Sequence, residues 1–302
     1  MKVLITGANG LLGQKLYLLL TKQDNSEVVA CSKGVNKNSF ISTNYLELDI
    51  TDKISVNKVF NEVCPDIVIN TAAMTNVDQC ESEKESCWQI NVSGVANLIE
   101  ACKNNRTFLI QLSTDFIFDG SAGPLDENAK PDPVNYYGES KLAGEKLIID
   151  SDIDWAIART VLVYGLIQEM SRSNIILWVK QSLEQGKDIN VVDDQWRTPT
   201  LAEDLAMGCY LIAKRRAKGI FNISGKDFLT PYRMAMKTAD FFNLDTSLIH
   251  KTDSIRFTQA ARRPLITGFN IKKAEDELNY NPHTFEEGLR ILADQVDKYS
   301  NH

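Results

Sequence analysis

The sequence has little histidine, and its cysteines are not spaced for metal binding. Only His250, His283 and His302 are present, all late in the chain, and the six cysteines form no C-x-x-C pair. Because zinc sites combine closely spaced cysteine and histidine, we predict no metal site. Isolated cysteines of this kind are typical of reduced, mostly buried thiols, so we expect a cytoplasmic protein.

Long apolar runs and excess positive charge are also missing. The first apolar run, 3–5, is broken at Gly7, which is too short for a signal peptide, and no run approaches the roughly 18 residues of a membrane span. The 33 basic and 40 acidic residues give a net charge of −7, so no general attraction to nucleic acid or anionic lipid is expected. We therefore predict no membrane or nucleic-acid partner and leave a homodimer open.

What the chain does have is an alternation of short apolar runs with longer amphipathic stretches. Such alternation is typical of βαβ units, and nearly continuous apolar runs indicate parallel strands covered on both faces. We predict strands around 3–5, 28–30, 46–48, 67–69, 108–112, 156–158, 189–192 and 220–223. We predict helices around 11–21, 54–63, 83–103, 136–149, 174–185, 201–213, 232–242, 271–278 and 285–299.

These elements predict an α/β protein with a Rossmann-type, doubly wound parallel sheet. With 302 residues, the chain is long enough for about two units. We assign residues 1–165 to a nucleotide-binding domain, with segments within 187–224 returning to its sheet. Residues 166–302 then form a smaller, discontinuous region that binds the substrate.

A glycine-rich segment, TGANGLLG (6–13), joins the first strand to the first helix. Its spacing lets the backbone approach a pyrophosphate, whose charge then lies at the positive end of the helix. The alternative is a glycine turn in an unrelated α/β protein, but the position at the first strand–helix junction favours dinucleotide binding. The predicted cofactor contacts here are Gly7, Asn9, Gly10, Leu11, Leu12 and Gly13.

The end of the second strand carries no carboxylate to bind the adenosine ribose of NAD. Ser32 and Lys33 stand there instead and are suited to a 2′-phosphate, so we predict a preference for NADP(H) and leave NAD(H) open. A merely solvated Lys33 is the alternative. Asp49 and Ile50, after the third strand, are predicted to touch the adenine, although Asp49 could equally cap a helix.

A tyrosine and a lysine lie four positions apart at the start of a predicted helix. Tyr137 and Lys141 share a helix face, and a nearby ammonium favours the phenolate form needed for proton exchange. Thr114 ends a predicted strand, at the sheet edge where open α/β folds bind ligands, and its hydroxyl can donate to a carbonyl oxygen. The alternatives are an exposed helical pair and a strand-end turn.

Taken together, these motifs resemble the extended short-chain dehydrogenase/reductase family, and within it the dTDP-4-dehydrorhamnose reductases. The resemblance covers nearly the whole chain. It rests on TGANGLLG (6–13), NTAA (70–73) followed by VD (77–78), STDFIFDG (113–120), YGESKLAGE (137–145), RT (159–160) before VYG (163–165), DQ (194–195) before TPT (198–200), and RP (263–264).

The resemblance implies NAD(P)H-dependent reduction of the 4-keto group of a nucleotide-linked 6-deoxysugar, giving dTDP-L-rhamnose in those reductases. It implies that Thr114 polarises the carbonyl, Tyr137 supplies the proton, and Lys141 holds the nicotinamide ribose. Gly7, Gly10 and Gly13 would bind the pyrophosphate, and Ala72 and Ala73 would line the cofactor groove. The residues expected to bind the nucleotide sugar are Thr75, Val77, Asp78, Asp115, Phe116, Trp196 and Arg263.

The sequence departs from these reductases at several positions. Phe116 stands where they commonly have tyrosine, Leu162 where they commonly have tryptophan, and Lys15 where some carry an acidic residue that binds magnesium. These changes leave the hydride chemistry intact but affect the prediction of the substrate. We expect Trp88, Trp155 and Trp178 in the core, and leave substrate contact and packing open for Trp196.

A second branch of the fold gives a rival interpretation. The regulatory β subunit of methionine adenosyltransferase shares the STDFIFDG-like and YGESKLAGE-like strings. This alternative would make the protein a non-catalytic, nucleotide-binding subunit that acts on a partner enzyme.

Overall fold

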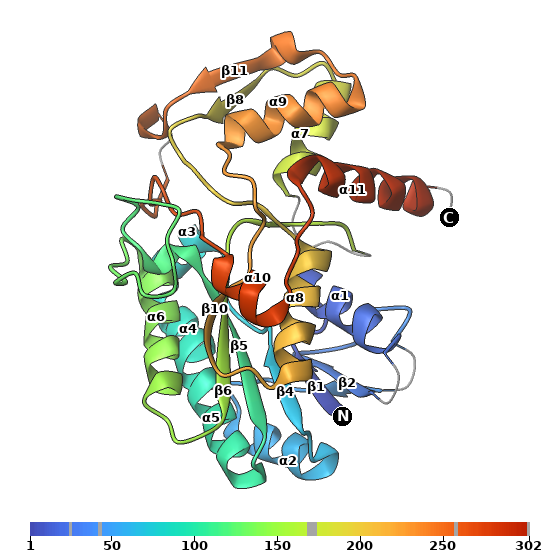
Figure 1. Ribbon diagram of the computed structural model, residues 1–302, viewed down its shortest axis with the longest axis vertical. Coiled ribbons are helices and arrows are strands. Elements are labelled where there is room, and N and C mark those ends of the chain that lie inside the picture. Colours follow the sequence, from blue (N-terminus) through green and yellow to red (C-terminus); the bar gives the residue numbers. More distant parts are fainter. Residues whose placement is uncertain (24–25, 42–43, 168–173, 257–258, 301–302) are drawn as a thin grey trace.

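The computed structural model describes residues 1–23, 26–41, 44–167, 174–256 and 259–300. Its main lobe is a parallel seven-stranded sheet in the order β10-β6-β5-β4-β1-β2-β3, seen in the lower part of Figure 1. The strands are β1 (Lys2–Thr6), β2 (Glu27–Ser32), β3 (Tyr45–Glu47), β4 (Ile67–Asn70), β5 (Phe108–Thr114), β6 (Trp155–Thr160) and β10 (Gly219–Asn222). The sheet confirms the predicted Rossmann-type α/β fold.

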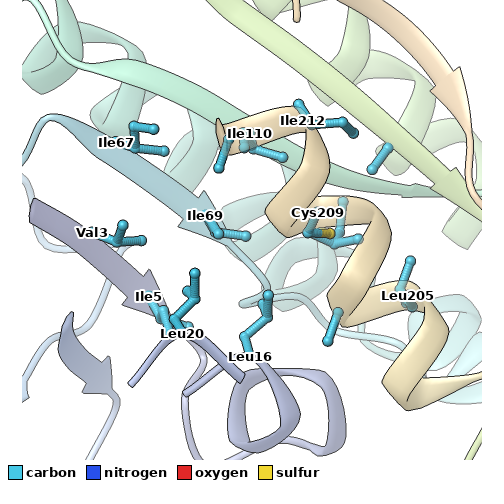
Figure 2. Packing of buried hydrophobic residues seen from close by; sticks show 14 of the residues in the cluster. Val3, Ile5, Leu16, Leu20, Ile67, Ile69, Ile110, Leu205, Cys209 and Ile212 are labelled. Atoms are coloured by element: carbon cyan, nitrogen blue, oxygen red, sulfur yellow. The ribbon is translucent and has the colours of Figure 1, made fainter. Parts of the chain in front are cut away.

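Helices cover both faces of this sheet. They are α1 (Leu11–Leu20), α8 (Ala202–Arg215) and α10 (Lys272–Leu278) on one face, and α2 (Lys53–Val63), α5 (Gly94–Asn105) and α6 (Tyr136–Ile149) on the other. Because strand side chains alternate, Val3 and Ile5 pack against the first set, while Leu4 packs against the second. Figure 2 shows the first core, with Leu16 and Cys209 from the helices meeting the strands.

Local sequence explains why these helices form where they do. Asp52 caps α2 by accepting a hydrogen bond from the Ile54 amide at 3.0 Å. The buried residues of this helix recur at helical spacing and face the sheet, and the helix ends at Cys64 in the left-handed conformation. Asn135 caps α6 in the same way, through the Gly138 amide at 2.8 Å, and so fixes where the Tyr137 turn begins.

A second, smaller lobe is built from the later part of the chain, in the upper part of Figure 1. It contains α7 (Ile175–Glu184), α9 (Pro231–Phe242), α11 (Phe285–Ser300) and the parallel pair β8 (Ile189–Val192) and β11 (Ile249–Thr252). Another short pair, β7 (Val163–Tyr164) and β9 (Thr200–Leu201), lies at the crossing between the lobes. Thus β10 returns to the main sheet, whereas β8 does not.

Two expectations about local structure need correction. The helix predicted over 83–103 is α4 (Lys84–Trp88), a π-helical turn (Gln89–Ser93) and α5 in succession. Trp88 and Trp178, expected in the core, are 42% and 39% exposed, because each lies on the outer side of its helix. The remaining short elements are α3 (Val77–Ser82) and the 3-10 turns Asp115–Ile117, Thr246–Leu248 and Ser254–Arg256.

Within the described ranges, no helix combines the length and the apolar character required to cross a membrane. Five of the six cysteines are buried and Cys64 is exposed, and all six carry thiols rather than disulfides.

Candidate active site

The glycine segment forms a tight cradle at the end of β1. Gly7 has φ +68°, and a side chain there would come within 2.7 Å of the Ala72 amide nitrogen. A side chain on Gly13 would come within 2.5 Å of the Gly7 carbonyl oxygen. Gly10 is the N-cap of α1 and makes no side-chain capping hydrogen bond, which leaves the first amides of the helix directed at the cradle. This cradle fits the pyrophosphate of a dinucleotide.

The other predicted cofactor residues surround the cradle. Leu11 and Leu12 open α1, and Ala72 and Ala73 are half-buried after β4. The Asn9 side chain holds the loop after β2, donating to the Val35 carbonyl at 2.9 Å and accepting from the Lys37 amide at 3.0 Å. Asn9 therefore fixes this loop beside the cradle.

In the folded chain, two carboxylates lie beside the end of β2, although the strand itself ends without one. The Lys33 ammonium lies 2.8 Å from the Asp49 carboxylate, and this hydrogen bond raises the Lys33 pKa. Asp49 accepts from Thr51, whereas Asp52 caps α2, so Asp49 is not the helix cap. Glu47, which the sequence reasoning missed, pairs with Ser32 in the sheet register and accepts from the Gly34 amide at 3.2 Å.

Ile50, the other predicted adenine contact, is 4% exposed and packs in the core beneath the sheet. Its side chain therefore lies away from the groove, against the position of Gly94.

The three predicted catalytic residues come together at the carboxyl edge of the sheet. Thr114 ends β5, while Tyr137 and Lys141 lie one turn apart on α6, and all are buried. The Thr114 hydroxyl accepts from the Phe116 amide at 3.2 Å and donates to Asp115 at 3.2 Å. Its neighbour Ser113 has a buried hydroxyl that makes no hydrogen bond within the described residues, so a polar group remains for a ligand at this edge.

Burial controls the protonation of these groups. It raises the pKa of Tyr137, while a hydrogen bond with Thr114 acts in the opposite direction. Burial also lowers the pKa of Lys141 to about 8, with the nearby Glu145 carboxylate opposing the shift. The expected lowering of the Tyr137 pKa by Lys141 is not found in this state, because loss of hydration dominates and raises this pKa.

A buried chain of hydrogen bonds connects the cradle to Lys141. The Thr6 hydroxyl donates to Asn70 at 2.5 Å, and the Asn70 amide donates to Gln111 at 2.7 Å. The Leu112 carbonyl then accepts from both Gln111, at 2.9 Å, and the Lys141 ammonium, at 2.7 Å. Sequence reasoning missed Asn70 and Gln111 as site residues, since a polar side chain inside a strand gives no local sign of its partner.

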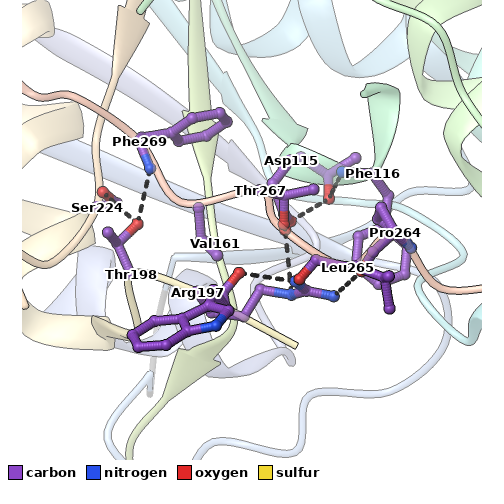
Figure 3. Close-up of polar contacts among 12 residues, drawn as sticks. Asp115, Phe116, Val161, Arg197, Thr198, Ser224, Pro264, Leu265, Thr267 and Phe269 are labelled. Carbon is purple, nitrogen blue, oxygen red and sulfur yellow. Dashed lines mark hydrogen bonds and ion pairs between the residues drawn. The ribbon is translucent and has the colours of Figure 1, made fainter. Parts of the chain in front are cut away.

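Asp115, predicted to bind the substrate, contacts Thr267 and Arg197 (Figure 3). It is 3% exposed, accepts from the Thr267 hydroxyl, and lies 3.6 Å from the Arg197 guanidinium. Arg197 also donates to the backbone carbonyls of Pro264 and Leu265, so the pair anchors the segment that crosses between the lobes. Burial raises the pKa of Asp115.

Arg263 and Asp78, also predicted to bind the substrate, contact each other. The Arg263 guanidinium donates to both Asp78 carboxylate oxygens, at 2.7 and 2.6 Å. That hydrogen bonding lowers the Asp78 pKa to about 2. A diphosphate would have to compete with this internal carboxylate for Arg263.

The remaining predicted substrate residues differ in their surroundings. Thr75 is exposed before α3, and Val77 packs with the cluster that contains Tyr137. The Phe116 ring meets the Tyr137 ring edge-on, with centroids 6.0 Å apart. Trp196 packs against Phe228, with the Arg233 guanidinium 4.5 Å from its ring centroid.

Lys15, the departure noted beside the cradle, lies 2.7 Å from Glu203 and donates to Gln295 at 3.1 Å. The described ranges contain no cluster of three or more His, Cys, Asp or Glu side chains able to hold a metal ion.

Comparison with known proteins identifies the family of this chain. Residues 1–298 match the family model described as the RmlD substrate binding domain. Methionine adenosyltransferase 2 subunit beta of Rattus norvegicus is 33% identical over 259 residues, which cover 84% of this chain and 76% of that protein. A Haloferax volcanii protein named probable low-salt glycan biosynthesis reductase Agl14 is 30% identical over 303 residues, the full length of both chains.

Among solved structures, a dTDP-4-dehydrorhamnose reductase from Bacillus anthracis in complex with NADP has a TM-score of 0.86 and 28% identity, covering 97% of this chain and 99% of that one. With matches that span almost all of the sequence, the chain belongs to the RmlD substrate-binding domain family, within the extended short-chain dehydrogenases/reductases.

Proposed function

We propose that this protein reduces the 4-keto group of a nucleotide-linked 6-deoxysugar, with NADPH preferred over NADH. One observation carries the proposal: Thr114, Tyr137 and Lys141 meet at the sheet edge next to a cradle that fits a pyrophosphate. The family and its solved relatives support a sugar-nucleotide reductase type of oxidoreductase and a nicotinamide cofactor.

The cofactor supplies a hydride when it is bound at the cradle glycines, the amides of α1, and Ala72 and Ala73. Tyr137 holds the proton for the carbonyl oxygen, because its raised pKa keeps the phenol protonated at neutral pH. The Thr114 hydroxyl would stabilise charge that develops on that oxygen. Lys141, whose pKa is about 8, is placed to return a proton towards Tyr137 and to hold a ribose hydroxyl.

The preference for NADPH rests on Ser32 and Lys33. The Lys33 side chain is 78% exposed, so it can turn from Asp49 to a 2′-phosphate at little cost. Glu47 and Asp49 oppose this preference, because carboxylates at this end of the sheet repel a phosphate. The NADP complex of the Bacillus relative favours the same choice.

The residues expected to meet the 6-deoxysugar are the ones at which this chain differs from dTDP-4-dehydrorhamnose reductases. Phe116 brings an apolar ring beside Tyr137, and Leu162, at φ +35° and 38% exposed, offers a small apolar surface. Both changes suit a sugar with few hydroxyls on the face that meets them. Thr75, Val77, Asp78, Trp196 and Arg263 remain the proposed contacts for the rest of the nucleotide sugar.

A panel of dTDP-, GDP- and UDP-linked 4-keto-6-deoxysugars tests the proposal directly. Purified protein is mixed with NADPH and each sugar, and loss of reduced nicotinamide is followed by absorbance. Turnover with at least one member supports the reductase. Absence of turnover with every member, in a preparation that binds NADPH by fluorescence titration, contradicts it.

A second candidate is a non-catalytic subunit, favoured by the identity to methionine adenosyltransferase β subunits. It predicts a stable complex with the catalytic subunit of a methionine adenosyltransferase. Size-exclusion chromatography of the mixed proteins tests this directly. Co-elution without any turnover of the sugar panel would favour this candidate over the reductase.

A further inference from the structure

Two cysteines lie directly behind the proposed proton donor. Cys80 is in α3 and Cys87 is in α4, and both are completely buried. They form one cluster with Met74 and Tyr137. The two helices are short and are separated at Glu83, whose φ of −120° and ψ of 55° lie outside the helical region. Across this break, both helices place a thiol in the same cluster.

The hydrogen bonds of this cluster centre on Asn91, in the π-helical turn. The Met74 carbonyl accepts from the Cys80 thiol at 3.6 Å and from the Asn91 amide at 3.1 Å. The same amide donates to the Cys87 sulfur at 3.5 Å and to the Ser140 hydroxyl at 3.0 Å. Cys87 and Ser140 are themselves 3.3 Å apart. Cys87 is therefore surrounded by polar groups, although it has no exposed surface.

These groups favour the thiolate of Cys87. Hydrogen bonding with Cys80 lowers the Cys87 pKa to about 7, burial opposes the shift, and hydrogen bonds with Ser140 and Asn91 and the Lys141 charge add to it. Elsewhere in the chain, burial alone raises the pKa of the Cys209 thiol to about 12. Thiolate character and a neighbouring second thiol are what distinguish redox-sensitive cysteines from structural ones.

We propose that Cys80 and Cys87 are a redox modification site, at which a peroxide converts the two thiols into a disulfide behind the active site. The Cys87 thiolate attacks hydrogen peroxide, forming an S–O bond while the O–O bond breaks, and the product is a sulfenic acid and hydroxide. The Cys80 sulfur then attacks the Cys87 sulfur. The S–S bond forms, the S–O bond breaks, and the Cys80 proton leaves with the oxygen as water. Peroxide is reduced by two electrons, and a thiol reductant reverses the change.

The oxidant must reach a buried sulfur, and the local structure allows this. Helices α3 and α4 have six and five residues, so little cooperative structure has to open for the cluster to become accessible. Local opening of this kind costs less than global unfolding. Cys102 and Cys209, by contrast, lie in the longer helices α5 and α8 under the central sheet.

The disulfide would affect the proposed proton donor through α6. Ser140 donates to the Tyr137 carbonyl at 2.8 Å and contacts Cys87, so it links the thiol cluster to the catalytic turn. Drawing Cys87 towards Cys80 removes the thiol from Ser140 and its charge from the vicinity of Lys141. Because small displacements of catalytic groups are costly, turnover should fall roughly tenfold in the oxidised protein. This effect on turnover rests on the proposed function, whereas formation of the disulfide does not.

The test uses full-length protein in which the exposed Cys64 is replaced by serine, which prevents disulfides between molecules. The protein is treated with hydrogen peroxide, denatured, alkylated with iodoacetamide and digested for mass spectrometry. We expect one peptide pair joined through Cys80 and Cys87, two mass units lighter than the thiols, that disappears after dithiothreitol. Unmodified, alkylated Cys80 and Cys87 after treatment, or Cys87 sulfinic acid without the disulfide, would overturn the proposal.

Cys80→Ser in the same background is the matched control. Its hydroxyl keeps a donor for the Met74 carbonyl, so the fold and the basal turnover should be retained. Oxidation should stop at the Cys87 sulfenic acid, detected as a dimedone adduct. If peroxide reduces turnover equally in this variant and in its parent, the disulfide is not the cause and the coupling to α6 is wrong. If no sugar is turned over by either protein, the disulfide map still decides the modification itself.

Discussion

The cradle and the surface between the lobes differ in how they are prepared for negative charge. At the cradle, Gly7, Gly10 and Gly13 carry no side chains that would cover the backbone amides at the N-terminus of α1. The first turn of this helix also has no acidic side chain. Between the lobes, Arg263 is already bound to Asp78. An anion enters the cradle without breaking a contact, but it reaches Arg263 only by displacing a carboxylate. The cofactor side is therefore pre-organised, and the substrate side must exchange an internal ion pair.

Tyr137 lies where the two regions meet, and its loss should have the largest effect. Tyr137→Phe removes the proton donor and keeps the ring, so turnover should fall by about 10²–10⁴-fold with cofactor affinity unchanged. Steady-state kinetics and NADPH fluorescence titration measure the two quantities. Tyr136→Phe, one position away and off the Lys141 face, is the control and should retain activity. A Tyr137→Phe enzyme with normal turnover would remove the residue from the proposed role.

The pre-organised cradle is tested by Gly13→Ala. The added methyl group would lie 2.5 Å from the Gly7 carbonyl oxygen and 2.6 Å from the Ala8 Cα, so the backbone must move. At about 1–3 kcal/mol for such overpacking, NADPH affinity should fall roughly tenfold to a hundredfold. Gly10→Ala meets its nearest atom at 3.2 Å and should cause a smaller loss. Equal affinities for both variants would show that the cradle is not rigid.

Lys33→Ala tests whether binding of NADPH also requires an ion pair, Lys33–Asp49, to break in exchange for a contact with the 2′-phosphate. If Lys33 leaves Asp49 for a 2′-phosphate, its loss should raise the Kd of NADPH about tenfold and leave that of NADH unchanged. Titration of both cofactors measures the ratio. Lys37→Ala, a second lysine in the same loop, serves as the control. An unchanged ratio in Lys33→Ala would remove the basis for the preference for NADPH.

The smallest expected effect is that of the Arg263–Asp78 ion pair on the free energy of unfolding. Arg263 lowers the Asp78 pKa from 3.8 to about 2, so the pair stabilises the fold fully above the unfolded value, and this stability is lost as the pH falls through the folded value. Because the Asp78 side chain is 41% exposed, the contribution is at most about 1 kcal/mol.

Urea unfolding of wild type and Asp78→Asn between pH 7 and about pH 2 measures this contribution. The difference in unfolding free energy should be constant above about pH 5 and shrink at lower pH. Asp152→Asn, which breaks an exposed pair with Lys103, is the control for a surface charge. A difference that grows as the pH falls would contradict the assigned shift.

Much of the fold was predictable because its signals are local. Apolar runs such as 3–5 and 108–112 mark strands buried on both faces, and the periodicity of α2 marks its buried side. The cradle and the Tyr137–Lys141 face were predictable for the same reason. The exposure of Trp88 and Trp178 was not, because apolar character alone does not say which side of a helix its neighbours cover.

The sequence by itself determined the order of the seven main-sheet strands along the chain, the position of the glycine turn, and the shared face of Tyr137 and Lys141, since each depends on residues only a few positions apart. Only the tertiary structure decided that Asp78 holds Arg263, that Asp115 faces Arg197, and that Cys80 meets Cys87 behind Tyr137. It also reversed the expected direction of the Tyr137 pKa. The physical reason is that ion pairing and loss of hydration depend on which distant segments pack together, and no local pattern records that.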